Sequence, residues 1–376
     1  MQGILSESDA LKAFDGWCAP RPEGPGSRVV AIGGDGIGPE VNDVAVAVLR
    51  ATGAPITIET PLSGEAAVKA GAPAFGPDVQ AACRKADAVL FGACDKVSTP
   101  ILRWLRFELD AYANLRPSSA LPHLPVRLQR GQDLVIVREL SEGLYPGREG
   151  SLADLAARWP EYKDSQQRGW ATDGKFAVRQ TTPAAVTRIA KVAAALALHR
   201  KARGLGRGKI TIVTKANVLP QTDGLFHAGC VEIFKQHGEL TVDHLFVDEA
   251  ARRLVAIPES FDVIVTSNLF GDILSDVAAE GVGGLPLAPS ASLGDGHAHF
   301  EPVHGSAPDI AGKGIANPLG AVLAGAMMLR HLGHATHAVK LVEAVLAIAK
   351  DGVRPRDLGG DAGTKQVGDA LLKRLG

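Results

Sequence analysis

Two aspartates, Asp272 and Asp276, have a spacing that could bind a metal ion. They follow an apolar run at residues 261–265 that predicts a buried strand. We expect a helix to begin near Asp272, so that the i, i+4 spacing places both carboxylates on one helix face. Two like charges placed in this way repel each other, whereas Mg²⁺ or Mn²⁺ binds carboxylate oxygens. A solvated acidic face is the alternative, but the apolar neighbours of the pair favour the metal.

Four arginines lie where they could bind an anion. Arg103 and Arg106 are three residues apart in a predicted helix. Arg116 and Arg138 lie at the ends of apolar runs. Because a guanidinium binds a carboxylate through paired hydrogen bonds, this set suits a di- or tricarboxylate substrate. Each arginine taken alone is equally explained as a surface charge.

Lys215 and Tyr145 are candidates for proton transfer. Lys215 directly follows an apolar strand pattern at residues 209–213, and strand ends are where ligand sites gather in α/β proteins. A lysine or a phenol in such a place suits general acid–base work. A lysine that extends to the surface and a core tyrosine explain the same pattern, and spacing alone does not separate these interpretations.

The composition is that of an ordinary globular chain. Its 376 residues are 46% hydrophobic and 22% charged, with a formal net charge of −1, which suits about two domains. Balanced charge gives no reason to expect nucleic acid or a membrane surface as a partner, and the apolar runs are too short for a membrane span. The cysteines have no C-x-x-C spacing and no secretory signal precedes them, which predicts reduced thiols and a cytoplasmic location. They are Cys18, Cys83, Cys94 and Cys230.

Alternating patterns predict an α/β fold with a mainly parallel central sheet. Strands are expected at 29–32, 86–91, 133–137 and 209–213, with helices after residue 39, over 183–199 and from about 321. The stretch after residue 295 is rich in glycine and proline and is expected to be irregular. In the glycine-rich turn at 33–40, Pro39 stands where a dinucleotide fingerprint needs glycine, so a Rossmann pyrophosphate loop is not expected.

Two segments interrupt this alternation. Residues 1–28 hold a short helical pattern and a linker rich in proline and glycine at 19–26, which predicts an appended arm. Residues 147–182 carry aromatic residues among charges, which suits an arm that packs against another subunit. These aromatic residues are Trp159, Tyr162 and Trp170.

Histidines recur in the C-terminal third. His297, His299 and His304 could suggest zinc, but no cysteine ligand accompanies them, so a structural metal is not expected there. The later histidines are interrupted by a glycine and are expected at the surface. They are His331, His334 and His337.

Several motifs resemble those of the β-decarboxylating dehydrogenases, the family of 3-isopropylmalate, isocitrate, homoisocitrate and tartrate/D-malate dehydrogenases. The resemblance covers about residues 29–376. Its motifs are residues 34–40, 112–117, 215–219, 301–318 and 357–360 and the Asp272/Asp276 helix. The resemblance implies two α/β domains around the central sheet with the active-site cleft between them, and not a Rossmann fold. The domains expected are a cofactor-binding domain at 29–111 plus 283–376, and a substrate and dimerisation domain at 112–282.

The resemblance also assigns ligands. Arg106, Arg116 and Arg138 look like the three arginines that hold the substrate carboxylates. Three aspartates would bind Mg²⁺ or Mn²⁺, with K⁺ as a further candidate ion. They are Asp248, Asp272 and Asp276.

The implied reaction oxidises a (2R)-hydroxy acid at C2 and releases its 3-carboxylate as CO₂. Lys215 would act as general base on the C2 hydroxyl, and Tyr145 would protonate C3. In the family, the counterparts of Lys215 and Asp248 reach the site from the partner subunit, which implies a homodimer with shared active sites. Thr214 stands where a histidine or aspartate usually precedes the lysine, which affects the hydrogen bonds around it.

Residues 301–318 resemble the family's cofactor loop. Asp309 and Ile310 stand where NADP-dependent relatives resemble Lys-Tyr. An aspartate there would repel a 2′-phosphate, so NAD is the expected cofactor. The expected cofactor contacts are Asn217, Glu301, His304, Gly305, Ser306, Ala307, Asp309, Ile310 and Asn317.

Leu102 and Arg103 bear on the choice of acid. Isopropylmalate enzymes present two leucines and an upstream glutamate here, whereas this chain keeps Leu102, replaces the second leucine by Arg103 and has Thr99 in place of the glutamate. Isocitrate enzymes use a serine and an asparagine, and this chain has Pro100 and Leu102 at those positions. An arginine three residues before Arg106 is closest to bacterial homoisocitrate dehydrogenases, which predicts a carboxylated malate derivative. The alternatives are 3-isopropylmalate, tartrate or D-malate, and a non-catalytic regulatory subunit, which the complete set of acid–base and metal groups disfavours.

Overall fold

The computed structural model of the chain describes residues 5–20, 26–125, 127 and 131–376. Its strands are β1 (Ser27–Gly34), β2 (Ile56–Glu59), β3 (Ala88–Ala93), β4 (Ala113–Ser119), β5 (Asp133–Glu139), β6 (Glu149–Ser151), β7 (Lys175–Ala177), β8 (Lys209–Thr214), β9 (Thr241–Phe246), β10 (Val263–Thr266), β11 (Pro289–Leu293) and β12 (Ala298–Pro302). Its helices are α1 (Glu7–Asp15), α2 (Gly38–Ala51), α3 (Gly64–Lys69), α4 (Pro77–Lys85), α5 (Thr99–Phe107), α6 (Leu152–Arg158), α7 (Pro183–Ala202), α8 (Thr222–Phe234), α9 (Val247–Ala256), α10 (Asn268–Gly281), α11 (Leu319–His331), α12 (Ala335–Lys350) and α13 (Thr364–Leu375).

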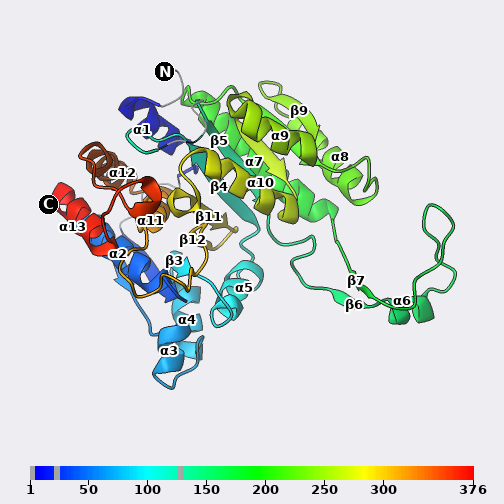
Figure 1. Cartoon of the computed structure of the whole chain (residues 1–376). Coiled ribbons are helices and arrows are strands. Elements are labelled where there is room, and N and C mark those ends of the chain that lie inside the picture. The colour runs from blue at the N-terminus through cyan, green and yellow to red at the C-terminus, as the bar shows by residue number, and fades with distance from the viewer. Residues whose placement is uncertain (1–4, 21–25, 126, 128–130) are drawn as a thin grey trace.

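A ten-stranded sheet runs through the molecule in the order β2-β1-β3-β12-β11-β4-β5-β10-β8-β9 (Figure 1). The strands are parallel within each outer half, from β2 to β12 and from β5 to β9. β11 and β4 join the two halves through antiparallel pairings. The predicted α/β fold with a mainly parallel sheet is therefore confirmed.

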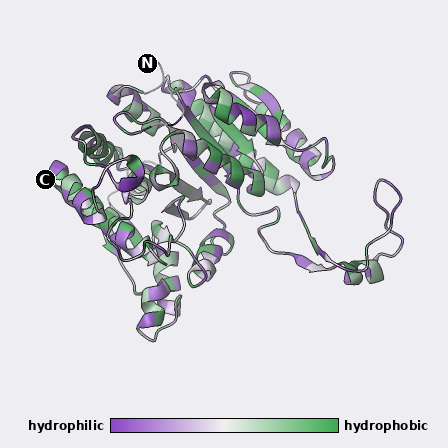
Figure 2. Cartoon of the chain, in the orientation of Figure 1, coloured by the Kyte–Doolittle hydropathy of each residue, from purple (hydrophilic) through white to green (hydrophobic). Residues whose placement is uncertain are grey.

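Helices cover both faces of the sheet. In β5, Leu134 and Ile136 pack in one cluster with α9 and α10, whereas Val135 and Val137 pack in the core that includes α7. Successive residues of a strand point to opposite faces, so a strand covered on both sides reads as a continuous apolar run. Figure 2 shows this as hydrophobic strands inside the body, in contrast to the largely hydrophilic loops around it.

The structure corrects two of the expected boundaries. The helix that carries Asp272 begins at Asn268. This start lies four residues before Asp272, near which the sequence predicted the helix to begin. One strand, β12, occupies part of the stretch after residue 295 that was expected to be irregular, and β11 lies just before that stretch. Both strands are short and carry buried polar residues such as Ser290 and His299, which hide the alternation that marks a strand.

Residues 5–20, here called the N-terminal segment, pack against the body. Ser6 caps α1 by accepting a hydrogen bond from the backbone N–H of Asp9 at 3.0 Å. Phe14 and Trp17 are buried in the main core. The prediction of a helix is confirmed, and the apolar face of this helix is covered by the body. That residues 1–28 form an appended arm stays a prediction. The predicted linker falls mostly on residues 21–25, which lie outside the described residues.

Residues 147–182, here called the arm, project away from the body (Figure 1). β6 and β7 pair antiparallel at its base, and α6 lies beyond them. Trp159 and Tyr162 are 54% and 59% exposed. Packing of the arm against another subunit stays a prediction, as do the domain boundaries.

Two further sequence-based points concern cysteines and membrane spans. Three of the four cysteines, Cys18, Cys83 and Cys230, are buried, and Cys94 is partly buried. In the part of the chain that the structure describes, no helix is both long and apolar enough to cross a membrane.

Candidate active site

Asp272 lies at the centre of a cluster of charged side chains. Its Oδ1 accepts a hydrogen bond from Arg138 Nη1 at 2.5 Å and lies 3.2 Å from Arg116 Nη1. Its Oδ2 accepts a hydrogen bond from the Tyr145 hydroxyl. Burial raises the pKa of Asp272, but Arg138 and Arg116 outweigh the burial and leave the pKa below its usual value. Asp272 is therefore an ionised carboxylate with strong cationic neighbours.

Arg138 is almost completely buried near the end of β5. Its Nε and Nη2 donate to Asn268 Oδ1 at 3.0 and 2.6 Å. Asn268 in turn donates to the carbonyls of Leu140 and Glu142, both at 3.0 Å. Gly271 leaves the space that this requires, because a Cβ there would lie 2.6 Å from Arg138 Cγ. Burial, reinforced by repulsion from Arg116, lowers the pKa of Arg138 to about 10, so it stays protonated at neutral pH.

Arg116 lies inside β4 and not at the end of an apolar run. Its Nη1 donates to Ser275 Oγ at 2.7 Å and lies 3.5 Å from Asp276 Oδ1. Its Nε donates to Asn114 Oδ1 at 2.9 Å. Asn114 and Ser275 thus orient the arginine as Asn268 orients Arg138. Sequence reasoning gave these orienting residues no role, although they lie within the motifs and the aspartate helix that it quoted.

Asp272 and Asp276 fit a divalent cation in their chemistry. Their side chains are 36% and 52% exposed, on consecutive turns of α10. Burial raises the pKa of Asp276. Asp248 is not with them, and within the described ranges no three His, Cys, Asp or Glu side chains gather as a metal site. This chain therefore offers two hard oxygen ligands, and a complete site needs more from elsewhere.

Lys215 and Asp248 form a separate pair at the ends of β8 and β9. The Lys215 ammonium donates to Asp248, and its backbone N–H donates to Asp223 Oδ2 at 2.5 Å. Thr214 is hydrogen bonded to His244 at 2.8 Å, so the unusual residue before the lysine has a side-chain partner. Among the described residues, no hydrogen bond or ion pair joins this pair to the two aspartates of α10. Asn217 follows in an exposed turn.

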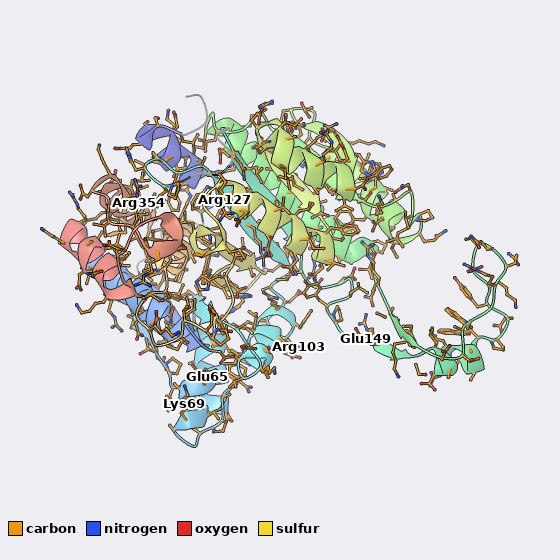
Figure 3. All side chains as sticks on the ribbon, viewed as in Figure 1. Glu65, Lys69, Arg103, Arg127, Glu149 and Arg354 are labelled. Atoms are coloured by element: carbon orange, nitrogen blue, oxygen red, sulfur yellow. The ribbon has the colours of Figure 1, made fainter. Side chains whose placement is uncertain are left out.

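α5 presents its two arginines in different ways. Arg106 Nη2 donates to Glu301 Oε1 at 3.0 Å, and both side chains are largely buried. Leu102 is partly buried. Arg103 is exposed on α5 (Figure 3). Its guanidinium lies 5.6 Å from the Phe107 ring and lines a cavity of about 640 Å³. The other lining residues include Pro100, Ser141, Pro146 and Arg148.

The loop after β12 borders a cavity of about 260 Å³ that suits a nucleoside. Ile37, Ala307 and Ile310 supply apolar walls, and His304 Nε2 is buried without a hydrogen-bond partner in the described part of the chain. Asn317 donates to Asp357 at 2.9 Å. Apolar walls with a few convergent polar groups are typical of cofactor sites. The remaining lining residues are Pro286, Gly305, Ile315, Asn317, Arg356 and Asp357.

The loop after β12 is held by a tight backbone approach. Ala307 has φ of +39°, in the left-handed region that non-glycine residues seldom adopt. Gly36 has φ of +58°, and a Cβ there would lie 2.1 Å from the carbonyl oxygen of Ser306. The glycine-rich turn after β1 therefore supports this loop directly. Ser306 is buried, whereas Gly305 and Asp309 are exposed.

The histidines differ from the prediction. His331 and His334 are buried and not at the surface. His334 is hydrogen bonded to Ser27 at 3.1 Å, and His331 lies 3.9 Å from Cys18 Sγ. The prediction was wrong because the N-terminal segment and β1 cover this end of α11. His297 and His299 are also buried, and neither belongs to a metal cluster among the described residues.

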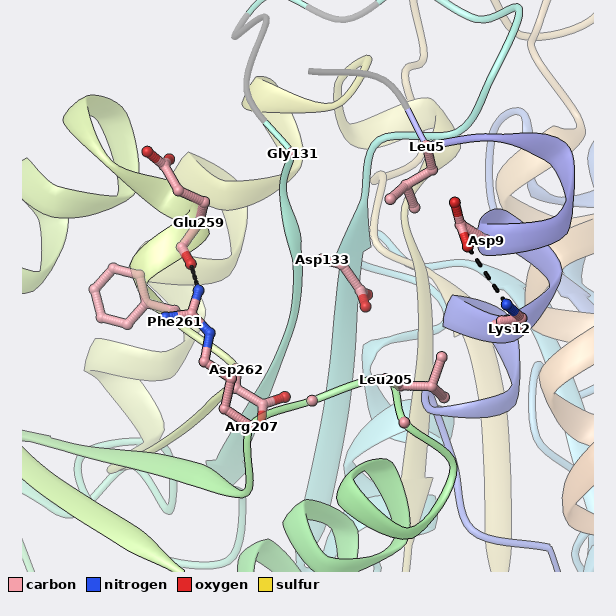
Figure 4. A pocket seen from close by; sticks show the side chains of 12 residues that line it. Leu5, Asp9, Lys12, Gly131, Asp133, Leu205, Arg207, Glu259, Phe261 and Asp262 are labelled. Atoms are coloured by element: carbon pink, nitrogen blue, oxygen red, sulfur yellow. Dashed lines mark hydrogen bonds and ion pairs between the residues drawn. The ribbon is translucent and has the colours of Figure 1, made fainter. Parts of the chain in front are cut away.

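Another cavity, of about 310 Å³, lies beside the N-terminal segment (Figure 4). It is bordered by Leu5 and Lys12 from that segment and by Asp133 at the start of β5. The charged cluster around Arg138 lies near the opposite end of the same strand. This cavity is therefore separate from the candidate active site.

Together, these features describe an α/β protein in which arginines of β4 and β5 face two carboxylates of α10. Residues 28–371 match the protein family described as isocitrate/isopropylmalate dehydrogenase, and the chain belongs to that family. The family assignment made from the motifs is therefore confirmed. The chain is an oxidoreductase that acts on a CH–OH group and carries out the family's oxidative decarboxylation of a small hydroxy acid.

Named relatives include two kinds of enzyme. The chain is 41% identical over 348 residues to the 3-isopropylmalate dehydrogenase of Archaeoglobus fulgidus, an alignment of 93% of this chain and 99% of the relative. It is also 41% identical over 354 residues to the isocitrate/homoisocitrate dehydrogenase of Thermus thermophilus, covering 93% and 98%. A crystal structure of isocitrate dehydrogenase from Methylococcus capsulatus superposes with a TM-score of 0.81 at 37% identity, covering 93% and 99%.

Proposed function

We propose that this protein is a homodimeric dehydrogenase that uses NAD and Mg²⁺ or Mn²⁺ to decarboxylate a carboxylated malate derivative such as homoisocitrate or isocitrate. One observation carries the choice of substrate. Arg103 has no ion pair in the described part of the chain, and it lines the cavity that Pro146, next to Tyr145, also lines. A guanidinium placed there suits an additional carboxylate on the substrate, whereas an isopropyl group would leave it without a partner.

The arginines would bind and orient the acid. Arg116 and Arg138 are held by asparagine and serine side chains, so their guanidinium groups are oriented before the ligand arrives. The two cations are balanced by Asp272 and Asp276, so a bound divalent cation would restore the positive charge that attracts a polyanion. Arg106 would supply the third guanidinium from α5.

Tyr145 has the properties of a proton donor. Burial, followed by its hydrogen bond to Asp272, raises the pKa of the Tyr145 phenol, so the hydroxyl stays protonated at neutral pH. It can therefore deliver a proton to C3 after CO₂ has left. When bound, NAD takes the hydride from C2 and the divalent cation supplies positive charge at the reacting end of the acid.

A shared active site explains where Lys215 and Asp248 lie. In one chain they pair with each other, apart from Asp272 and Asp276, which need further ligands. In a dimer, Lys215 of the partner subunit would hold the proton of the C2 hydroxyl, and Asp248 of the partner subunit would complete the metal site. Ile273 on α10 is 53% exposed and offers an apolar surface for such a contact. A cytoplasmic location also stays a prediction.

The cofactor is proposed to be NAD. Ile310 lines the cavity and Asp309 next to it is exposed, so a 2′-phosphate would meet a carboxylate there. Arg356 also lines the cavity, which makes the comparison of NAD with NADP a necessary control.

A second candidate substrate is 3-isopropylmalate. Leu102 is retained beside Arg103, and the Archaeoglobus relative with this name is as similar as the Thermus relative. In this case Arg103 would point away from the bound acid.

Measured kcat/KM values for NADH formation with Mn²⁺ separate the two candidates. The acids are isopropylmalate, isocitrate, homoisocitrate, D-malate and tartrate. A charge-assisted hydrogen bond contributes about 1.5–3 kcal/mol, so Arg103→Leu should shift preference toward isopropylmalate by roughly 10- to 150-fold. Arg84→Leu, which removes an arginine that lies over Trp104, is the matched control.

The outcomes test the proposed substrate separately from the family assignment. Unchanged relative kcat/KM values in Arg103→Leu would remove the substrate proposal and leave the family assignment in place. Absence of metal-dependent NADH formation with every acid would favour the regulatory-subunit alternative.

A further inference from the structure

The ion pair of Arg106 and Glu301 joins α5 to β12, the strand that leads into the proposed nucleotide-binding loop. Arg106 projects from α5, and Glu301 is the next-to-last residue of β12. His304, three residues further along, already borders the nucleoside cavity. The two side chains are 16% and 9% exposed, so this contact is shielded from solvent and is stronger than a surface pair.

Glu301 determines where the Arg106 guanidinium points. In the described part of the chain, Glu301 is the one side chain that hydrogen bonds to this guanidinium, and the buried Nε of Arg106 has no partner. His299 Nε2 lies 3.7 Å from Glu301 Oε1, and both its ring nitrogens lack a hydrogen bond among the described residues. Among the residues that the structure describes, no other carboxylate forms an ion pair with Arg106. The direction of Arg106 thus depends on one carboxylate of the β12 strand.

A second link ties the other end of α5 to the same loop. Asp35 is fully buried and accepts hydrogen bonds from the backbone N–H groups of Asp95 and Ser98, both at 2.8 Å. Ser306 Oγ donates to Asp95 Oδ2 at 3.1 Å. Ser98 directly precedes α5, so the start of the helix and its Arg106 face are both connected to residues 301–306. A shift of the cofactor loop must therefore move α5 or break one of these links.

We propose that Glu301 is a positioning residue that couples binding of the nucleotide to binding of the acid. The proposal rests on the proposed function, because it takes residues 304–317 as the nucleotide site and Arg106 as an acid ligand. A nucleotide that orders the loop fixes Glu301, and Glu301 then fixes Arg106 in the direction that binds the acid carboxylate. By thermodynamic linkage the acid tightens nucleotide binding by the same factor.

The test measures this coupling without turnover. NADH and a hydroxy acid are both reduced and do not react, so their joint binding is an equilibrium. NADH fluorescence, measured in the presence of Mg²⁺, gives the Kd of NADH for the dimer with and without a saturating acid. The acid is homoisocitrate or, if another of the five acids is oxidised faster, that acid. In the wild type, the acid should tighten NADH binding by at least about fivefold.

Glu301→Gln keeps the shape of the side chain but removes its charge, and it should reduce this coupling below about twofold while raising the KM for the acid. Glu301→Asp shortens the side chain and should also lose coupling. This second variant tests the inference if Glu301→Gln does not fold. His299→Leu is the matched control, because it changes the packing beside Glu301 but leaves the Arg106–Glu301 pair intact. It should keep the wild-type coupling.

Retention of wild-type coupling in the folded Glu301 variants would overturn the inference, and so would an equal loss in His299→Leu, because packing of β12 would then be the cause. The proposed function fails in a different way. If the wild type oxidises none of the acids, the proposed function is wrong. If the wild type is active but the acid does not tighten NADH binding, only this inference is wrong.

Discussion

The N-terminal segment and the arm use their aromatic residues in opposite ways. Phe14 is fully buried and packs edge-on against Trp17, with ring centroids 5.4 Å apart. In the arm, Tyr162 and Trp170 stack with their centroids 5.2 Å apart, and Trp159 remains more than half exposed. Aromatic contact alone therefore does not tell whether a segment belongs to the core.

Polar contacts explain the difference. Trp17 Nε1 donates to Ser119 Oγ at 2.9 Å, and Ser119 donates to Asp133 at 2.8 Å, so the buried indole has a satisfied N–H. In the arm, Trp170 Nε1 donates to the Trp159 carbonyl, eleven residues away in the same segment. One segment is connected to distant strands, and the other is connected mainly to itself.

The charges follow the same division. Asp15 pairs with Arg330 of α11 at 2.5 Å and with Arg203 near α7 at 3.3 Å, so it links helices from the two predicted domains. In the arm, the pair of Asp164 and Arg168 is local and exposed, whereas Arg179, close to the body, pairs with Asp223 of α8 at 2.5 Å. The N-terminal segment lies before the region matched by the family, yet its Phe14 and Trp17 are buried in the main hydrophobic core.

The largest effect is expected from Phe14→Ala. Removing a buried phenylalanine leaves a cavity and should lower the free energy of unfolding by about 3–5 kcal/mol. Trp159→Ala, the matched change in the arm, should lower the unfolding free energy of the isolated chain by no more than about 0.5 kcal/mol. Urea denaturation at low protein concentration measures both. Equal losses would mean that the two segments are packed alike, contrary to the comparison.

The arm should matter instead for assembly. If it packs against a partner, Trp159 is its strongest candidate anchor, and Trp159→Ala should weaken the dimer by about 2 kcal/mol or more, roughly 30-fold in Kd. Sedimentation velocity over a concentration series measures this. Phe14→Ala, compared under conditions where it remains folded, is the control and should change the dimer Kd much less. An unchanged Kd in Trp159→Ala would place the arm outside the interface.

A smaller effect is expected from Asp15→Asn. Arg330 is almost fully buried and loses its ionic partner, whereas Asp15 itself is partly exposed, so the expected loss of unfolding free energy is about 1–3 kcal/mol. Asp9→Asn removes an exposed pair with Lys12 on the same helix and should lower the free energy of unfolding far less than Asp15→Asn does. Thermal or urea denaturation of both variants measures these losses of unfolding free energy. Similar small losses would show that Asp15 is not part of the core.

Sequence reasoning could find groups whose spacing is itself the signal. Asp272 and Asp276 needed only an i, i+4 pattern, and the strands around Arg138 needed only apolar runs covered on both faces. The pairing of Asn268 with Arg138 was not visible, because it depends on two segments that are 130 residues apart. The same is true of His331, whose burial depends on contacts with Cys18, far away in the chain. Local periodicity predicts elements, whereas long-range contacts decide which polar residues those elements bury.

The smallest effect concerns the arm's own stacking, and it sharpens the comparison most. Tyr162→Leu removes a stacked pair that contributes about 0.5–1.5 kcal/mol beyond burial. Because the arm is connected mainly to itself, this loss should appear as faster hydrogen exchange of amides in residues 149–177, while exchange in β5 and α7 stays unchanged. In Phe14→Ala, by contrast, the slowest core amides should exchange faster together. If Tyr162→Leu also accelerated the core amides, the arm would be part of the same cooperative unit as the N-terminal segment, and the distinction between the two regions would be lost.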